Sequence, residues 1–129
     1  MVTAIRLGRP YCVEVRNGRS ILLSDTQKDG KGGDAGMRPH ELLESALAAC
    51  ISMSIDMAAE RAAVTLPAGT VEVVIERLDH ETGFDVSLHF TGALSVAQQH
   101  LVRGAVQASP VARTLGKSVR VRPVVIMTA

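Results

Sequence analysis

The chain has 129 residues, a size typical of one domain, and a formal net charge of +1. Hydrophobic residues make up 47% of it and aromatic residues only 2%, so we expect a core of aliphatic side chains and methionine. The charge balance gives no electrostatic reason to expect binding to nucleic acid or to anionic membranes. We therefore interpret residues 1–129 as a single domain without a nucleic-acid or membrane partner.

The expected location is cytoplasmic. No run approaches the ~18 uninterrupted apolar residues of a membrane span, and residues 1–6 lack the apolar core of a signal peptide. Two cysteines, Cys12 and Cys50, are too few for a disulfide scaffold. A reducing compartment would keep both as free thiols.

The first part of the chain has the pattern of β-strands over residues 2–24. Val13 and Val15 alternate with polar neighbours, and Asn17-Gly18 predicts a hairpin with a two-residue turn before a return strand at 20–23. Residues 25–37, rich in glycine and charge, predict a flexible polar loop that could serve as a lid or an interface arm. The loop lacks the Gly-Lys-Ser/Thr ending of a phosphate-binding loop.

A long helix is predicted from Pro39 to Arg61, with its proline tolerated in the first turn. We expect it to stop near residues 64–67. On a 3.6-residue wheel, Cys50 shares its side with five residues, namely Leu43, Ala46, Leu47, Ser54 and Met57. The thiol is therefore predicted on the apolar, buried face.

The rest of the chain predicts a hairpin, two helices and a final strand. Strands at 70–76 and 84–90 alternate polar and apolar residues, which indicates one buried face. Ser95 with Gln98 forms a capping box for the next helix. Ser109 before a proline starts a short helix that Gly116 ends, and residues 119–127 predict the last strand. The order of elements indicates an α+β fold with antiparallel sheets and a long central helix.

Cys50 is the residue best suited to chemistry. The four histidines have no zinc-site spacing, and no Gly-x-Ser-x-Gly motif is present, so we expect neither a metal nor a cofactor. A free cysteine most often packs as a small apolar side chain. Reactivity requires a nearby cation or hydrogen-bond donor that favours the thiolate. Arg19 and His40 are candidates for that role, although spacing alone cannot place them.

The sequence around Cys50 resembles the OsmC/Ohr family of osmotically induced proteins and organic hydroperoxide reductases. The resemblance lies in a segment preceded by Gly32-Gly33, which reads Pro39-x-Glu41-Leu42-Leu43-x-x-Ala46-Leu47-Ala48-Ala49-Cys50. A second segment, Ala108-Ser109-Pro110-Val111-Ala112-Arg113-Thr114-Leu115, is similar to the region around that family's second cysteine. With the order of strands and helices, the resemblance extends over almost the whole chain.

The resemblance implies an intertwined homodimer with interface active sites and a thiol peroxidase mechanism. Cys50 matches the cysteine that attacks the hydroperoxide. The position of the second cysteine, which resolves the sulfenic acid as a disulfide, is occupied by Ser109, whose hydroxyl cannot form one. The remaining thiol, Cys12, lies in a predicted strand, and nothing in the sequence brings it near Cys50.

Two further site residues follow from the resemblance. Arg19 is the counterpart of the family's arginine, and His40 aligns with the glutamate that supports the thiolate in the peroxidase branch. His40 precedes Cys50 by ten residues, which places it about 15 Å away along the helix axis. If His40 assists Cys50, we therefore expect it to do so from the other subunit.

Two functions remain open at this point. The first is an OsmC-like homodimer that weakly reduces organic hydroperoxides through Cys50, with an external thiol as reductant. The alternative is a catalytically degenerate OsmC-like dimer that binds a small apolar ligand. Retention of Cys50 favours the first, and loss of the second cysteine at Ser109 favours the other.

Overall fold

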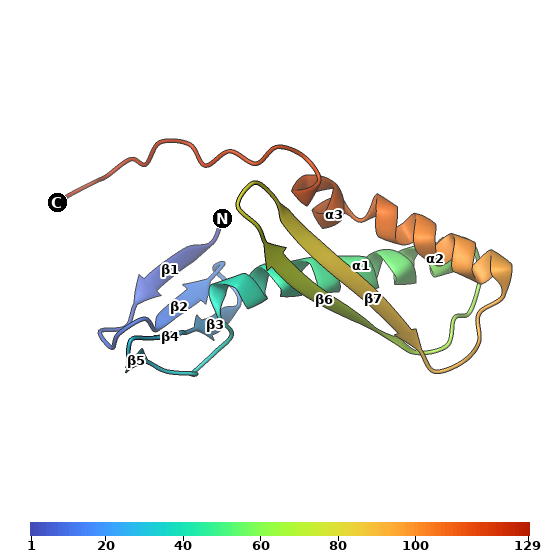
Figure 1. The fold of residues 1–129 in the computed structure, drawn as a ribbon, viewed down its shortest axis with the longest axis horizontal. Helices are drawn as coiled ribbons and strands as arrows, with labels where there is room; N and C mark the ends of the chain where they lie inside the picture. The colour runs from blue at the N-terminus through green and yellow to red at the C-terminus, as the bar shows by residue number, and fades with distance from the viewer. The chain divides into compact units, whose positions relative to one another are not determined.

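The computed structural model describes residues 1–129 and has an α+β architecture. It contains two compact units, which we describe separately: residues 1–46 with 73–85, and residues 47–72 with 86–129. Helix α1 (Pro39–Arg61) continues from the first unit into the second, as does the hairpin of β6 (Gly69–Arg77) and β7 (Thr82–Phe90). The predicted fold class, with antiparallel sheets and one long helix, is confirmed (Figure 1).

The N-terminal sheet is an antiparallel meander of β1 (Thr3–Arg6), β2 (Val13–Arg16) and β3 (Ile21–Ser24). The predicted hairpin at Asn17 is present, and the backbone N–H of Asn17 donates to the carbonyl of Ser20 at 3.2 Å, which leaves two residues, Gly18 and Arg19, in the turn. The Asn17 side-chain oxygen accepts the backbone N–H groups of Arg19 at 3.0 Å and of Ser20 at 2.8 Å. This side chain closes the turn, as asparagine does in many short connections.

The prediction of a flexible loop over residues 25–37 is wrong for its central part. Strands β4 (Gln27–Lys28) and β5 (Lys31–Gly32) pair there as a small antiparallel hairpin. Asp29 and Gly30 form its turn with φ values of 54° and 76°. Positive φ at both central residues is the requirement of a type I′ turn, and Asp-Gly is one of its preferred sequences.

A buried carboxylate anchors this loop. Asp25 is only 4% exposed, and its two oxygens accept the backbone N–H groups of Thr26 at 2.9 Å and of Ala35 at 3.1 Å. The neighbouring Ser24 donates its hydroxyl to the carbonyl of Met37 at 2.7 Å. Side chains at the start of the segment therefore bind backbone groups at its end and hold it in one conformation.

Helix α1 runs unbroken from Pro39 to Arg61 (Figure 1). Its buried residues recur every four positions and are Leu47, Ile51, Ile55 and Ala59. The prediction that Cys50 lies on the buried face is wrong, because the thiol lies on the flank of this stripe and is half-buried. Leu43 and Met57, assigned to the same face as Cys50, are 48% and 52% exposed. The helical periodicity of apolar side chains did not identify which side of the helix packs against the core.

By length and composition alone, α1 is also apolar enough to cross a membrane. This finding qualifies the expectation that no segment has membrane-spanning character. It is weak evidence for a membrane span, because core helices of soluble proteins meet the same criteria.

The predicted hairpin after α1 is confirmed. Strands β6 and β7 pair with each other, and the backbone N–H of Leu78 donates to the carbonyl of Glu81 at 2.8 Å across the turn. Half-buried and exposed residues alternate along both strands. Strand β6 also bonds to helix α1, since the Glu44 side chain accepts the backbone N–H of Ile75 at 2.8 Å.

Both C-terminal helices begin where the sequence predicts, and the second also ends at the predicted residue. Helix α2 (Val96–Ala108) starts with the complete capping box of Ser95 and Gln98. Helix α3 (Pro110–Leu115) starts with Ser109 as its N-cap and ends at Gly116. Ser109 is thus the single residue between the two helices, ending α2 and capping α3.

The predicted last strand is wrong for this single chain. Residues 117–129 have no regular secondary structure and leave α3 as an extended segment (Figure 1). Val121 and Ile126 are 91% and 82% exposed. A strand forms only where a neighbour pairs with its backbone groups, and the chain bonds no strand to this segment.

The close backbone approach at Gly36 gives a test of the loop. A Cβ atom there would overlap the carbonyl of Leu23, whereas one at Gly83 would meet nothing within 4 Å. We expect Gly36→Ala to lower the free energy of unfolding by about 1–3 kcal/mol, as overpacking does in other proteins. Urea denaturation of both variants measures this, with Gly83→Ala as the matched control. Equal losses in the two variants would contradict the close approach.

Candidate functional site

The site is centred on Cys50 and Ser109, which lie 59 residues apart in sequence within the second unit. The Ser109 hydroxyl donates a hydrogen bond to the Cys50 Sγ atom, with 3.1 Å between oxygen and sulfur. Ser109 is 0% exposed, whereas Cys50 is half-buried. The fold therefore brings together the two positions that the sequence matched to a pair of cysteines, and leaves the sulfur open to reagents.

Helix capping fixes the Ser109 side chain in this place. Its Oγ atom accepts the backbone N–H of Ala112 at 3.4 Å, and its own N–H donates to the carbonyl of Val106 at 3.2 Å. Pro110 occupies the first position of α3, where its missing N–H costs nothing. Because the oxygen already accepts a bond, its proton is free to point at the sulfur.

The pKa of the Cys50 thiol lies below its ordinary value. The hydrogen bond from Ser109 is the largest cause, followed by one from the backbone N–H of Val111. Burial acts in the opposite direction, and the Ser54 hydroxyl adds a smaller lowering effect. Donors of this kind stabilise the charged form of the thiol. The thiolate is thus favoured by neutral hydrogen-bond donors of the second unit.

Sequence reasoning missed Val111 and the role of Ser54. Val111 lies in the first turn of α3, where backbone N–H groups have no partner within the helix. The Ser-Pro start signal at Ser109 could have pointed to such a donor. Ser54 follows Cys50 by four residues, the spacing at which helical side chains lie on one face.

Arg19 and His40 belong to the first unit, while Cys50 and Ser109 belong to the second. Arg19 is exposed in the turn between β2 and β3, and its backbone N–H bonds to Asn17. His40 is half-buried in the first turn of α1. Their proposed roles beside the thiol stay predictions. Cys12 also belongs to the first unit, is 2% exposed and carries a free thiol.

A groove of about 390 Å³ lies beside the thiol in the second unit. Two of its lining residues border the Cys50 environment: Ser54 lies one helical turn after Cys50 and lowers its pKa, and Pro110 follows Ser109. The other lining residues are mostly apolar or small and come from α1 and α2, namely Met57, Ala58, Arg61, Leu101, Gly104, Ala105 and Ala108. This volume is within the range of small-molecule sites.

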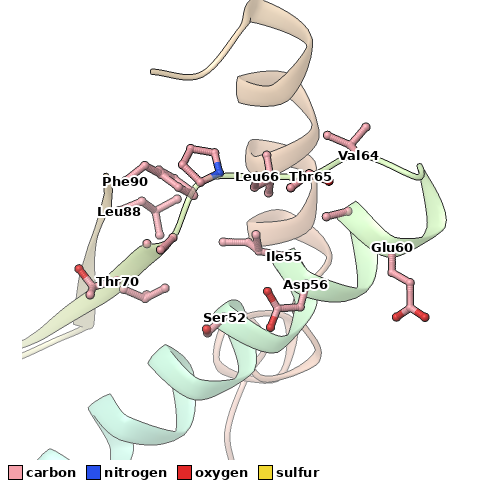
Figure 2. Close-up of a pocket in the computed structure, with 15 residues that line it drawn as sticks. Ser52, Ile55, Asp56, Glu60, Val64, Thr65, Leu66, Thr70, Leu88 and Phe90 are labelled. Atoms are coloured by element: carbon pink, nitrogen blue, oxygen red, sulfur yellow. The ribbon is translucent and has the colours of Figure 1, made fainter. Parts of the chain in front are cut away.

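A second cavity, of about 380 Å³, lies on another side of α1 (Figure 2). Figure 2 shows Ile55, Leu66, Leu88 and Phe90 around it, and the Glu60 carboxylate pointing away. It is lined by neither cysteine nor histidine. No group of three or more His, Cys, Asp or Glu side chains in the chain could hold a metal ion. The lining of this cavity is mixed, because the side chains of Asp56 and Glu60 and the hydroxyls of Ser52, Thr65 and Thr70 also border it.

Comparison with known proteins identifies a family for this chain. The family model of OsmC-like protein matches residues 30–123, a span that includes Cys50 and Ser109. No match was found among the curated proteins compared with the chain.

Several solved structures have the same fold. An osmotic stress induced and detoxification response protein from Psychrobacter arcticus is 18% identical with a TM-score of 0.74, and the match covers 88% of this chain and 85% of that one. An organic hydroperoxide resistance protein OsmC from Legionella pneumophila is 23% identical with a TM-score of 0.65, covering 88% and 86%. An organic hydroperoxide resistance protein from Vibrio cholerae, with captopril in one of its active sites, is 26% identical with a TM-score of 0.61, covering 88% and 83%.

The family model spans most of the chain, and the structural matches cover nearly all of its fold. The chain therefore belongs to the family of OsmC-like proteins.

Proposed function

We propose that this protein is a single-cysteine, thiol-dependent organic hydroperoxide reductase that acts through Cys50. The observation that carries the proposal is the hydrogen bond from the buried Ser109 hydroxyl to a half-buried sulfur. The lowered pKa of Cys50 supports it, because the thiolate is the nucleophilic form of cysteine. Membership of the OsmC-like family, with relatives described as organic hydroperoxide resistance proteins, supports the substrate class.

In the first half-reaction, the Cys50 thiolate attacks the terminal oxygen of the hydroperoxide. A sulfur–oxygen bond forms, the oxygen–oxygen bond breaks, and the alkoxide leaves to take up a proton as the alcohol. Cys50 is oxidised to sulfenic acid and the hydroperoxide is reduced. The Ser109 hydroxyl donates a hydrogen bond to the sulfur, and Val111 and Ser54 lower its pKa further, so the anionic form that attacks is favoured.

In the second half-reaction, an external thiol replaces the missing internal cysteine. Its sulfur bonds to Cys50 with release of water, and a second thiol then displaces Cys50 as a free thiol, leaving the small-molecule disulfide. The Vibrio cholerae relative holds captopril, itself a small thiol, in one of its active sites. That relative supports a site accessible to small thiols in this chain.

We extend the proposal to a homodimer in the cytoplasm. The exposed C-terminal segment, residues 117–129, alternates valine with arginine over 119–122 and has no strand beside it. A second copy that pairs with this segment would bury its apolar side chains and satisfy its backbone groups. The two free thiols, Cys12 and Cys50, suit a reducing compartment.

The alternative function, binding of a small apolar ligand without catalysis, is favoured by one observation. The cavity in Figure 2 is bordered by Ile55, Leu66, Leu88 and Phe90 and has no thiol in its lining. If the protein binds an apolar ligand there, Cys50 is not needed. Dependence of activity on Cys50 therefore separates the two functions.

Substitution of the thiol tests the proposed reaction directly. We expect Cys50→Ser to abolish loss of cumene hydroperoxide in the presence of a thiol, because a hydroxyl does not replace the thiolate as nucleophile. Cys12→Ser, at a buried site in the first unit, is the matched control and should retain the parent rate. Peroxide loss is followed by a ferrous-iron assay, and sulfenic acid is trapped and measured by mass spectrometry. A Cys50→Ser protein as fast as the parent would refute the proposal in favour of the ligand-binding function.

Removal of the Ser109 hydroxyl tests its effect on the thiol. We expect Ser109→Ala to raise the pKa of Cys50, because the largest donor to the sulfur is lost. The alkylation rate by iodoacetamide should therefore fall about fivefold below the titration midpoint, given ~1 kcal/mol for one hydrogen bond. The midpoint should move to higher pH, and the two proteins should react alike at high pH, where both are thiolate.

Ser95→Ala is the control for Ser109→Ala, since it also removes a helix N-cap but lies at the start of α2. It should leave the midpoint of Cys50 alkylation unchanged. An unchanged midpoint in Ser109→Ala would mean that the hydroxyl does not stabilise the thiolate.

The dimer is tested by shortening the chain. We expect the full chain to be a dimer by light scattering at micromolar concentration, and a chain ending at Ser118 to be a monomer, because the pairing segment is removed. Circular dichroism of the shortened chain checks that its helices remain. A dimer of undiminished stability without residues 119–129 would assign the interface to another surface.

A further inference from the structure

The groove beside Cys50 has a charge at one end only. Ser54 and Pro110 border it near the sulfur, and Arg61 is the one charged residue in its lining. Between them the walls consist of Met57, Leu101 and small residues of α1 and α2. The groove thus carries a guanidinium in its wall, and two of its other lining residues, Ser54 and Pro110, neighbour the Cys50–Ser109 pair.

Arg61 is available to bind an anion. It is exposed at the last turn of α1, and the ion pairs of the chain, Arg16 with Glu14 and His89 with Glu72, do not include it. A cation at this end of a helix also stabilises the helix through its dipole, without any ligand. That role leaves the donor groups of the guanidinium free, and these match a carboxylate in geometry.

The distance from sulfur to guanidinium limits the ligand's size. Arg61 follows Cys50 by eleven residues, about 16 Å along the helix axis. Its side chain leans toward the N-terminus of the helix, which shortens the gap to the sulfur. An extended peptide of three residues spans about 10 Å. The reach of the Arg61 side chain makes up the remaining separation, so a ligand of this length can have its thiol near Cys50 and a carboxylate near Arg61.

We propose that this groove binds the external thiol, as an anionic peptide-like thiol of two or three residues with its carboxylate at Arg61. This inference rests on the proposed function and names the chemical class of its reductant. The ligand's sulfur bonds to the Cys50 sulfenic sulfur, water leaves, and a second molecule of the same thiol reduces the mixed disulfide.

The anionic ligand of this groove is the reductant rather than the hydroperoxide. With a hydroxyl at Ser109, each turnover needs two encounters with an external thiol and one with a peroxide. The attacking thiol reacts as its thiolate, so a cation beside its path favours both its approach and its reactive form. An anion site at Arg61 therefore assists the two steps in which an external thiol replaces the missing cysteine.

The two half-reactions are measured separately by stopped flow. Protein oxidised with one equivalent of cumene hydroperoxide is mixed with glutathione or with its diethyl ester, and rates are compared at equal thiolate concentration. We expect glutathione to react about fivefold faster than the ester, the effect of one exposed ion pair. Arg61→Gln should lose this preference, and added salt should weaken it in the parent.

Arg103→Gln is the matched control, because Arg103 is an exposed arginine of α2 that lines a different groove. It should keep the preference for glutathione. Equal rates for glutathione and its ester in the parent, or an unchanged preference in Arg61→Gln, would overturn the inference. A preference seen only in the hydroperoxide step, for a hydroperoxide acid over its ester, would overturn it as well.

A binding measurement with an unreactive ligand distinguishes failure of this inference from failure of the proposed function. S-methylglutathione cannot react, so its affinity for the reduced protein is measured by calorimetry whether or not peroxide is consumed. We expect it to bind more tightly than its diester, with the difference lost in Arg61→Gln and kept in Arg103→Gln. Absence of that difference overturns the inference, while absence of Cys50-dependent peroxide loss refutes only the proposed function.

Discussion

The hydrogen bond from Ser109 to Cys50 is the interaction on which the candidate site depends. It joins the middle of α1 to the junction of α2 and α3, and its donor is fully buried. The same oxygen accepts a backbone N–H of α3, so its proton is directed at the sulfur by helix capping. One side chain therefore contributes both to the stability of the short helix and to the charge state of the thiol.

The sequence left two kinds of thiolate stabilisation open, a nearby cation or a hydrogen-bond donor, and the resemblance named Arg19 as the cation. Within the second unit, the largest effects on the pKa of Cys50 come from donors, the Ser109 hydroxyl and the backbone N–H of Val111. Neutral donors of this kind act over hydrogen-bond distances and are less sensitive to salt than exposed ion pairs are. Within the second unit, the reactive form of the thiol depends on local packing.

Features set by neighbouring residues could be predicted from the sequence. The capping box of Ser95 and Gln98 and the start of α3 at Ser109 are confirmed, because their hydrogen bonds join residues three apart. The pairing of Cys50 with Ser109 followed from the family motifs, since no local pattern relates residues so far apart in sequence. The hairpin turn at Asp29-Gly30 was missed although its signal was present, because the surrounding glycines were interpreted as flexibility.

Features that depend on distant partners could not be predicted. The wheel placed Cys50 beside Leu47 on an apolar side, but the buried stripe runs from Leu47 through Ile51 and Ile55, so Cys50 lies at its flank, and periodicity alone cannot show this. The alternation over residues 119–127 is typical of a strand, yet a strand needs another to pair with, and the chain supplies none. The roles of Arg19 and His40 likewise depend on how residues of different units meet.

A hydroxyl at Ser109 has a consequence for damage by excess oxidant. A second cysteine would convert the sulfenic acid to a disulfide, which protects the sulfur from further oxidation. With serine there, the lifetime of the proposed sulfenic acid is set by how much reductant surrounds the half-buried sulfur. When peroxide exceeds reductant, the same sulfur proceeds to sulfinic acid, which most proteins cannot reverse. Such a protein would be inactivated by the oxidant it removes, at a dose fixed by the thiol content of its surroundings.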